Sequence, residues 1–128
     1  DYDIPADAPP RPGRHLYGHS KYLGQEICKV FADYYRLEIP ALLFAEFIAP
    51  ETGQPRPLYP FAVSWRDAAR AIRSALQVPT VPEPFEILHI NADLPHGRYT
   101  NRKAKEVLGW RPVDDLRHMW TITEKSQQ

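Results

Sequence analysis

The 128-residue sequence has few of the residues that mark several classes of protein. Its single cysteine, Cys28, excludes an internal disulfide and a cysteine metal cluster, and so favours a reducing cytoplasm. Net charge is also missing, because 16 Lys and Arg balance 16 Asp and Glu, which argues against nucleic acid or an anionic membrane surface as a partner. No run of about 18 apolar residues is present to span a membrane.

Methionine is nearly absent as well. The sequence starts at Asp1 and its only methionine is Met119. We therefore expect the chain to be part of something longer.

Proline, in contrast, is abundant, and its 14 residues partition the chain because proline ends helices and central strands. The prolines form an extended N-terminal arm and two loops, through Pro5, Pro9, Pro10 and Pro12, through Pro50, Pro55, Pro57 and Pro60, and through Pro79, Pro82 and Pro84. Three proline-free windows between them are long enough for helices.

Hydrophobic periodicity predicts two long helices in these windows. The first covers Gly18 to Tyr35. Its apolar positions recur at the spacing of one helix face, at Leu16, Leu23, Ile27, Phe31 and Tyr34. The second lies within Phe61 to Val78, where Ser64 and Asp67 form a capping pair. Its apolar face is expected to hold Trp65, Ala68, Ala69, Ile72, Ala75 and Leu76.

The remaining elements are short. The almost uninterrupted apolar segment Ile39 to Ile48 predicts one strand covered on both faces, as in a parallel sheet. Phe85 to Ile90 predicts a second strand, and Asn101 to Leu108 a helix closed by Gly109. Two strands are too few for a stable sheet, so the missing strands are expected from a lost N-terminal part or from another chain.

A possible acid/base pair opens the first helix. Tyr17 and Lys21 are four residues apart, which places them on one helix face within mutual reach. A nearby cation favours the phenolate form of a tyrosine, which would let it exchange protons with a substrate hydroxyl. The spacing alone is weak evidence, because about 0.3 such pairs are expected by chance in this composition.

Further sequence segments strengthen this interpretation, because they match one known family and follow one another in the same order as in that family. Leu16 to Lys21 resembles the Tyr-Gly-x-Ser-Lys catalytic helix of the extended short-chain dehydrogenases/reductases, the NAD-dependent epimerase/dehydratase family. Ile39 to Pro50 looks like that family's next strand, and Val63 to Ile72 like its helix beginning at an aspartate. Ala104 to Pro112 is similar to its block before the C-terminus. The resemblance covers nearly the whole chain.

The resemblance implies an α/β fold, the C-terminal part of a Rossmann-like NAD(P)-binding fold with a small substrate-binding lobe. Residues 1–50 would carry the arm, the catalytic helix and a late strand, and residues 51–128 the lobe. The full-length enzyme would be an NAD(P)-dependent sugar epimerase, dehydratase or dehydrogenase, acting on a sugar nucleotide or a uronate-like sugar. Tyr17 would be the acid/base, and Lys21 would hold the cofactor ribose.

Two features depart from the family. Its glycine-rich phosphate turn and upstream catalytic serine or threonine have no counterpart, so the isolated chain is expected to be inactive. Phe44 stands about where many members carry an arginine, which leaves the substrate undecided. The alternative is a non-catalytic binding or interaction module derived from this family.

The remaining candidates are polar residues after the second strand, which are assigned to substrate contacts: His89, Asn91, His96 and Arg98. His15 and His19 have no third ligand nearby, so no metal site is expected. Cys28 is expected to be a buried thiol, and Trp65 and Trp110 to pack in the core. A homodimer through the catalytic helix is among the expected partners.

Overall fold

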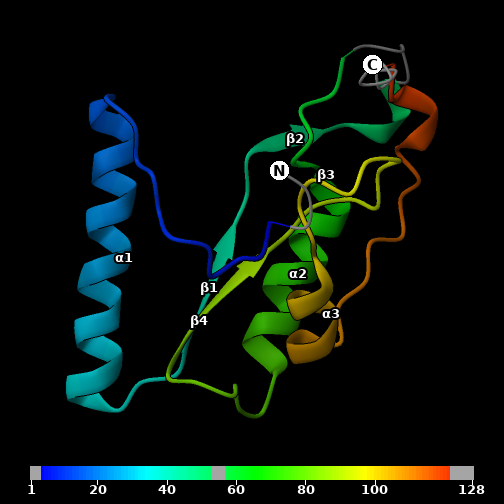
Figure 1. The fold of residues 1–128 in the computed structure, drawn as a ribbon. Helices are drawn as coiled ribbons and strands as arrows, with labels where there is room; N and C mark the ends of the chain where they lie inside the picture. The colour runs from blue at the N-terminus through cyan, green and yellow to red at the C-terminus, as the bar shows by residue number, and fades with distance from the viewer. Residues whose placement is uncertain (1–3, 53–56, 122–128) are drawn as a thin grey trace.

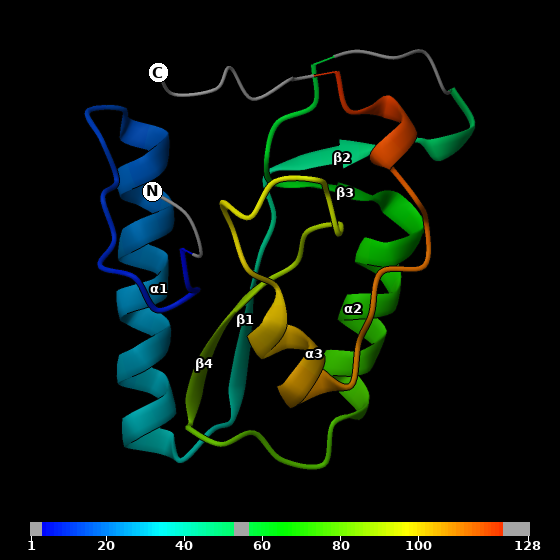
Figure 2. The same ribbon diagram turned by 45° about the vertical axis from the view of Figure 1, so that its right-hand side comes forward.

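The computed structural model describes residues 4–52 and 57–121, so parts of the arm and of the first proline loop, residues 1–3 and 53–56, lie outside it. The chain forms a two-stranded parallel sheet with one helix on one face and two on the other (Figures 1 and 2). The single helix is α1, Leu16–Tyr35, and the other two are α2, Trp65–Gln77, and α3, Arg102–Leu108. Two short 3-10 helices cover Pro50–Thr52 and Arg117–Met119.

The central sheet pairs β1, Ile39–Leu43, with β4, Phe85–His89. Their register is parallel, with Ile39 beside Phe85 and Leu43 beside His89. The parallel direction confirms the prediction that the Ile39 segment belongs to a parallel sheet, and β4 is the neighbour that this chain itself supplies. Residues 1–50 and 51–128 each contribute one strand to this sheet. The domain boundary at residue 50 stays a prediction.

The prediction of one strand over Ile39 to Ile48 is wrong in detail. The apolar segment divides into β1 and β2, Glu46–Ile48, and β2 pairs in parallel with β3, Ala62–Ser64. The segment thus holds two strands where one was expected, and β3 is a further strand that the sequence analysis did not predict. The break at Phe44 and Ala45 lets the chain leave β4 for a different partner, which hydrophobicity alone does not encode.

The helix boundaries follow their local signals closely. α1 begins two residues before the predicted start and ends at Tyr35 as predicted. α2 begins after Ser64, whose hydroxyl oxygen accepts a hydrogen bond from the Asp67 backbone N–H at 3.0 Å. α3 ends at Gly109, which has a φ of 62°, the left-handed conformation that glycine adopts without strain.

A buried carboxylate joins α2 to the C-terminal segment. Asp67 is fully buried and accepts hydrogen bonds from the backbone N–H groups of Val113 and Asp114, at 2.9 and 3.0 Å. The indole N–H of Trp110 donates to the Asp67 carbonyl at 3.0 Å. These bonds satisfy a charge that would otherwise be costly to bury, and they fix residues 110–114 against α2.

The buried apolar residues form two hydrophobic clusters, of which the first includes the buried face of α2. One gathers Val63, Ala68, Ala71, Leu88, Ile90, Ala104 and Trp110. The other gathers Ile48, Leu58, Ala62, Ala92, Leu116 and Met119. Trp110 therefore has the predicted core role, whereas the prediction is wrong for Trp65, which is largely exposed. Cys28 is only half-buried, not the fully buried thiol that was expected.

The apolar face of α1 lies away from the strands. Leu16 is 84% exposed and Tyr34 is 77% exposed. The other members of this apolar stripe are also exposed, namely Leu23, Ile27 and Phe31. The residue of α1 that is fully buried is Ala32, because the helix packs on β1 and β4 through its more polar side.

Candidate functional site

Tyr17 and Lys21 lie together in the first turns of α1. The Lys21 Nζ atom is 5.3 Å from the centre of the Tyr17 ring, within the range of a cation–π contact. Tyr17 is 73% exposed, so its hydroxyl is open to a ligand. The predicted mutual reach of the two side chains is therefore present in the structure.

The position of this pair relative to the strands favours ligand binding. α1 runs antiparallel to β1 and β4, so that its first turns lie toward the carboxyl ends of both strands (Figure 1). Ligands of open α/β folds bind outside the carboxyl ends of parallel strands. Tyr17 and Lys21 thus lie at the end of the sheet where chemistry is expected.

The arm that precedes α1 is fixed at both ends. Near its start, the Ile4 N–H donates to the Arg98 carbonyl at 2.8 Å, and the Thr100 N–H donates to the Ile4 carbonyl at 3.3 Å. Near its end, the Pro12 carbonyl lies against Gly18. The arm therefore crosses from the loop after β4 to the Tyr17 turn.

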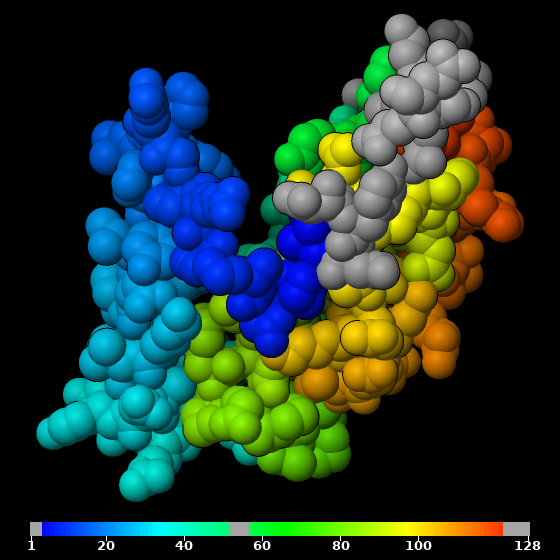
Figure 3. All heavy atoms as spheres, viewed as in Figure 1, coloured from blue at the N-terminus to red at the C-terminus, as the bar shows by residue number. Residues whose placement is uncertain are grey.

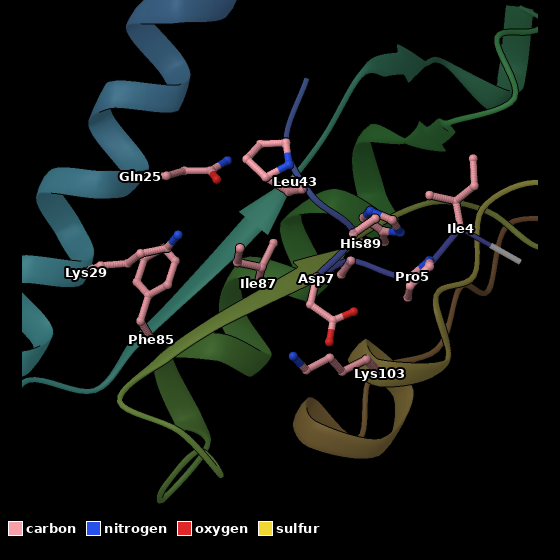
Figure 4. Close-up of a pocket in the computed structure, with 13 residues that line it drawn as sticks. Ile4, Pro5, Asp7, Gln25, Lys29, Leu43, Phe85, Ile87, His89 and Lys103 are labelled. Carbon is pink, nitrogen blue, oxygen red and sulfur yellow. The ribbon is translucent and has the colours of Figure 1, made fainter. Parts of the chain in front are cut away.

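A hollow of about 400 Å³ lies beneath the arm, between α1 and β4. In Figure 3 the arm passes in front of this region, between α1 and the rest of the chain. Gln25 and Lys29 of α1 line it, and they continue at intervals of four residues the row that starts with Tyr17 and Lys21. Figure 4 shows both side chains pointing from the helix toward the strands. On the opposite side, Asp7 and Lys103 point toward one another.

His89 is the predicted substrate residue that lines this hollow. It is the last residue of β4 and only 6% exposed. Its Nδ1 atom is 3.1 Å from the Thr100 carbonyl oxygen. Burial lowers the pKa of His89, although the Thr100 carbonyl and the charge of Asp7 act in the opposite direction.

The other three predicted substrate residues have different surroundings, and none of them lines the hollow. Asn91 is buried in the loop after β4, where its amide nitrogen donates to the Ala92 and Tyr99 carbonyls. The His96 ring lies 4.8 Å from that of Trp120 and accepts a hydrogen bond from the Arg98 N–H. Arg98 itself is exposed.

Sequence reasoning missed several residues that surround the hollow. Gln25, Lys29 and Lys103 line it, and so does Asp7 of the arm. The four-residue spacing from Lys21 was the available signal for Gln25 and Lys29. No local signal links Asp7 or Lys103 to α1, because they come from the arm and from α3.

Two further properties concern the described residues as a whole. Over residues 4–52 and 57–121, no cluster of His, Cys, Asp and Glu is arranged to hold a metal ion. Within the same ranges, no helix combines the length and apolar character needed to cross a membrane.

The fold is similar to that of solved sugar-acid dehydrogenases. Uronate dehydrogenase from Agrobacterium tumefaciens matches 98% of this chain with a TM-score of 0.71 and 21% identity. A mutant of that enzyme complexed with NAD matches 92% with a TM-score of 0.69. Glucuronic acid dehydrogenase from Chromohalobacter salexigens matches 89% with a TM-score of 0.68 and 20% identity.

This chain spans less than half of each of these proteins, namely 47%, 44% and 41% of their lengths. No protein-family model matches the sequence, and no curated protein is significantly similar to it. The fold likeness confirms the predicted partial Rossmann-like α/β fold.

Proposed function

We propose that this chain is the C-terminal portion of an NAD(P)-dependent oxidoreductase of the extended short-chain dehydrogenase/reductase type that acts on a sugar. The observation that carries the proposal is the contact of Lys21 with the Tyr17 ring, 5.3 Å from Nζ to the ring centre. This contact occurs at the carboxyl end of parallel strands in a fold shared with uronate dehydrogenases.

Tyr17 acts as the general acid/base in this proposal. Its phenolic oxygen accepts a proton from a substrate hydroxyl during oxidation and returns it during reduction. The ammonium of Lys21 lies on the same helix face one turn away, in contact with the Tyr17 ring. The exposure of Tyr17 gives a substrate room to approach.

The residues present fit only one end of a nicotinamide cofactor. When bound, the cofactor supplies or accepts the hydride. In this proposal, Lys21 would donate hydrogen bonds to the ribose hydroxyls of the cofactor. The pyrophosphate requires a glycine-rich turn at a helix N-terminus, and neither positive-φ glycine of the described residues, Gly13 and Gly109, belongs to such a turn. The proposal therefore assigns the phosphate site to a part of the enzyme other than these residues.

Dehydrogenation is favoured over epimerisation or dehydration, because the similar structures are dehydrogenases. The structure says less about which sugar is the substrate. Phe44, about where many family members carry an arginine, packs against the first hydrophobic cluster, with its ring 5.4 Å from that of Phe47. This position therefore offers no cation to a uronate carboxylate.

A homodimer contact is assigned to the α1 stripe of Leu16, Leu23, Ile27, Phe31 and Tyr34. Such a row of exposed apolar side chains on a long helix suits packing against a second copy of that helix. Cytoplasmic localisation remains part of the proposal and rests on the single cysteine.

The test uses the intact gene product that contains this chain. We expect it to reduce NAD⁺ or NADP⁺ with a sugar substrate, D-glucuronate and D-galactose being the first anionic and neutral candidates. Tyr17→Phe should lower kcat about 10²–10⁴-fold with little change in folding. Lys21→Met should weaken both turnover and cofactor binding, because one ammonium serves two partners.

Near-normal turnover by Tyr17→Phe would overturn the acid/base assignment. An intact product that binds neither NAD⁺ nor NADP⁺ would support the alternative, a non-catalytic binding or interaction module. The reading frame upstream of Asp1 provides an early indication, since the enzyme requires a glycine-rich turn and a serine or threonine there.

A further inference from the structure

His89 has one ring nitrogen committed to the protein and one available. Its Nδ1 faces the Thr100 carbonyl, which only accepts hydrogen bonds, so Nδ1 carries the proton. In the neutral ring, Nε2 is then an acceptor. The hydrogen bond of the His89 ring is made at Nδ1, and the residue, which is 6% exposed, lines the hollow.

The His89 ring is held in a fixed orientation. Phe61 and Tyr99 both contact it edge-on, with ring centres 4.9 and 6.0 Å away. Together with the Thr100 hydrogen bond, these contacts prevent the ring from rotating toward another partner. The acceptor is therefore preorganised at the carboxyl end of β4.

The charges around the hollow are locally compensated. Lys29 is paired with Glu26 at 2.6 Å, and Lys103 with the buried Glu86 at 2.6 Å. Asp7 points toward Lys103 on the side of the hollow opposite α1 (Figure 4). Because neither sign is in surplus, the hollow is not built for a strongly charged ligand.

The hydrogen-bond donors and acceptors that line the hollow indicate which kind of ligand it can bind. Nε2 of His89 and the Asp7 carboxylate accept hydrogen bonds, the two lysines donate, and the Gln25 amide does both. A hydroxyl group also does both, so a polyhydroxylated molecule can satisfy all of them. Leu43, Phe85 and Ile87 supply the apolar wall that such a ring can cover.

We propose that the hollow between the arm, α1 and β4 binds a small neutral polyhydroxylated molecule, one hydroxyl of which donates a hydrogen bond to Nε2 of His89. The volume of about 400 Å³ is within the range of small-molecule sites. This site is separate from the proposed acid/base pair, because Tyr17 and Lys21 do not line it. Tyr17 is eight residues, or about 12 Å along the helix axis, from Gln25.

The test follows the histidine nitrogens of the intact gene product, without added nicotinamide cofactor, by NMR of ¹⁵N-labelled histidine. The probes are myo-inositol and D-glucose, with D-glucuronate as the anionic comparison. We expect either neutral probe to shift the Nε2 resonance of His89 saturably. His89→Phe should weaken binding about tenfold or more, since it keeps a ring but removes the acceptor.

Two further variants make the result decisive. Gln25→Leu removes another polar group without touching His89 and should also weaken binding. His118→Phe changes an exposed histidine that does not line the hollow and should leave binding unchanged. If His89→Phe fails to fold, the wild-type Nε2 shift and the Gln25→Leu result decide.

An unshifted Nε2 with both neutral probes would overturn the proposal, as would unchanged binding in Gln25→Leu and His89→Phe. A response to D-glucuronate alone would overturn the neutral ligand class. Tyr17→Phe should keep the His89 response, so failure of this site and failure of the proposed enzyme activity are distinguishable.

Discussion

A Cβ atom on Gly18 would collide with the carbonyl oxygen of Pro12. Only glycine lets the arm approach the first turn of α1 this closely. Gly18, which follows Tyr17 in the sequence, therefore allows the arm to pack against the helix turn that carries the proposed acid/base pair.

We expect Gly18→Ala to destabilise the protein by about 1–3 kcal/mol, because the new methyl group meets backbone and not a movable side chain. The matched control is Gly24→Ala, since Gly24 lies in the same helix with nothing within 4 Å of its Cβ position. That change should stabilise the helix by about 0.5–1 kcal/mol. Denaturant unfolding measures both, and equal signs for the two variants would contradict the Pro12 contact.

The 128-residue chain by itself should not bind NAD(H) or NADP(H) in the micromolar range. The physical reason is the missing cradle of backbone N–H groups for the pyrophosphate. Titration calorimetry of the chain, with the intact gene product as the positive control, measures this. Saturable micromolar binding by the chain alone would show that the cofactor site was wrongly assigned.

The isolated chain should also self-associate through the α1 stripe defined above. Leu23→Lys combined with Ile27→Lys should weaken association about tenfold or more without unfolding, because both side chains are exposed in the monomer. Leu76→Lys, on the exposed side of α2, is the matched control and should have a smaller effect. Sedimentation at several concentrations tests this; a monomeric wild-type chain would rule it out.

His89 should make stability depend on pH. Burial holds its folded pKa below the ordinary value of about 6.5, so below that pH the unfolded chain takes up a proton that the folded chain does not. Stability should therefore fall as pH drops from about 6.5 toward the folded pKa. The charged groups lining the same hollow are Asp7, Lys29 and Lys103. The free energy of unfolding, measured at several pH values, should fall more steeply below about pH 6.5 in the wild type than in His89→Phe. The same pH dependence in both proteins would contradict the lowered pKa of His89.

Local chemistry made much of the secondary structure predictable. Ser64 and Asp67 mark the start of α2, because a side-chain cap satisfies N–H groups that the helix leaves free. Gly109 marks the end of α3, because glycine adopts without strain the left-handed conformation that ends many helices. The mutual reach of Tyr17 and Lys21 was equally predictable, because four residues make about one helical turn.

Tertiary structure decided what depends on partners distant in sequence. The sequence from Ile39 to Ile48 is apolar except for Glu46, and hydrophobicity does not tell which strand pairs with β1 and which with β2. In the sequence, His89 and Asn91 are alike, because both are polar residues close to the end of a strand. The fold directs His89 into the hollow and Asn91 into backbone hydrogen bonds, because the loop carrying Tyr99 and Thr100 returns against β4. Periodicity established that α1 has an apolar face, but only packing showed that this face is exposed, since which side meets the strands depends on the elements that surround the helix.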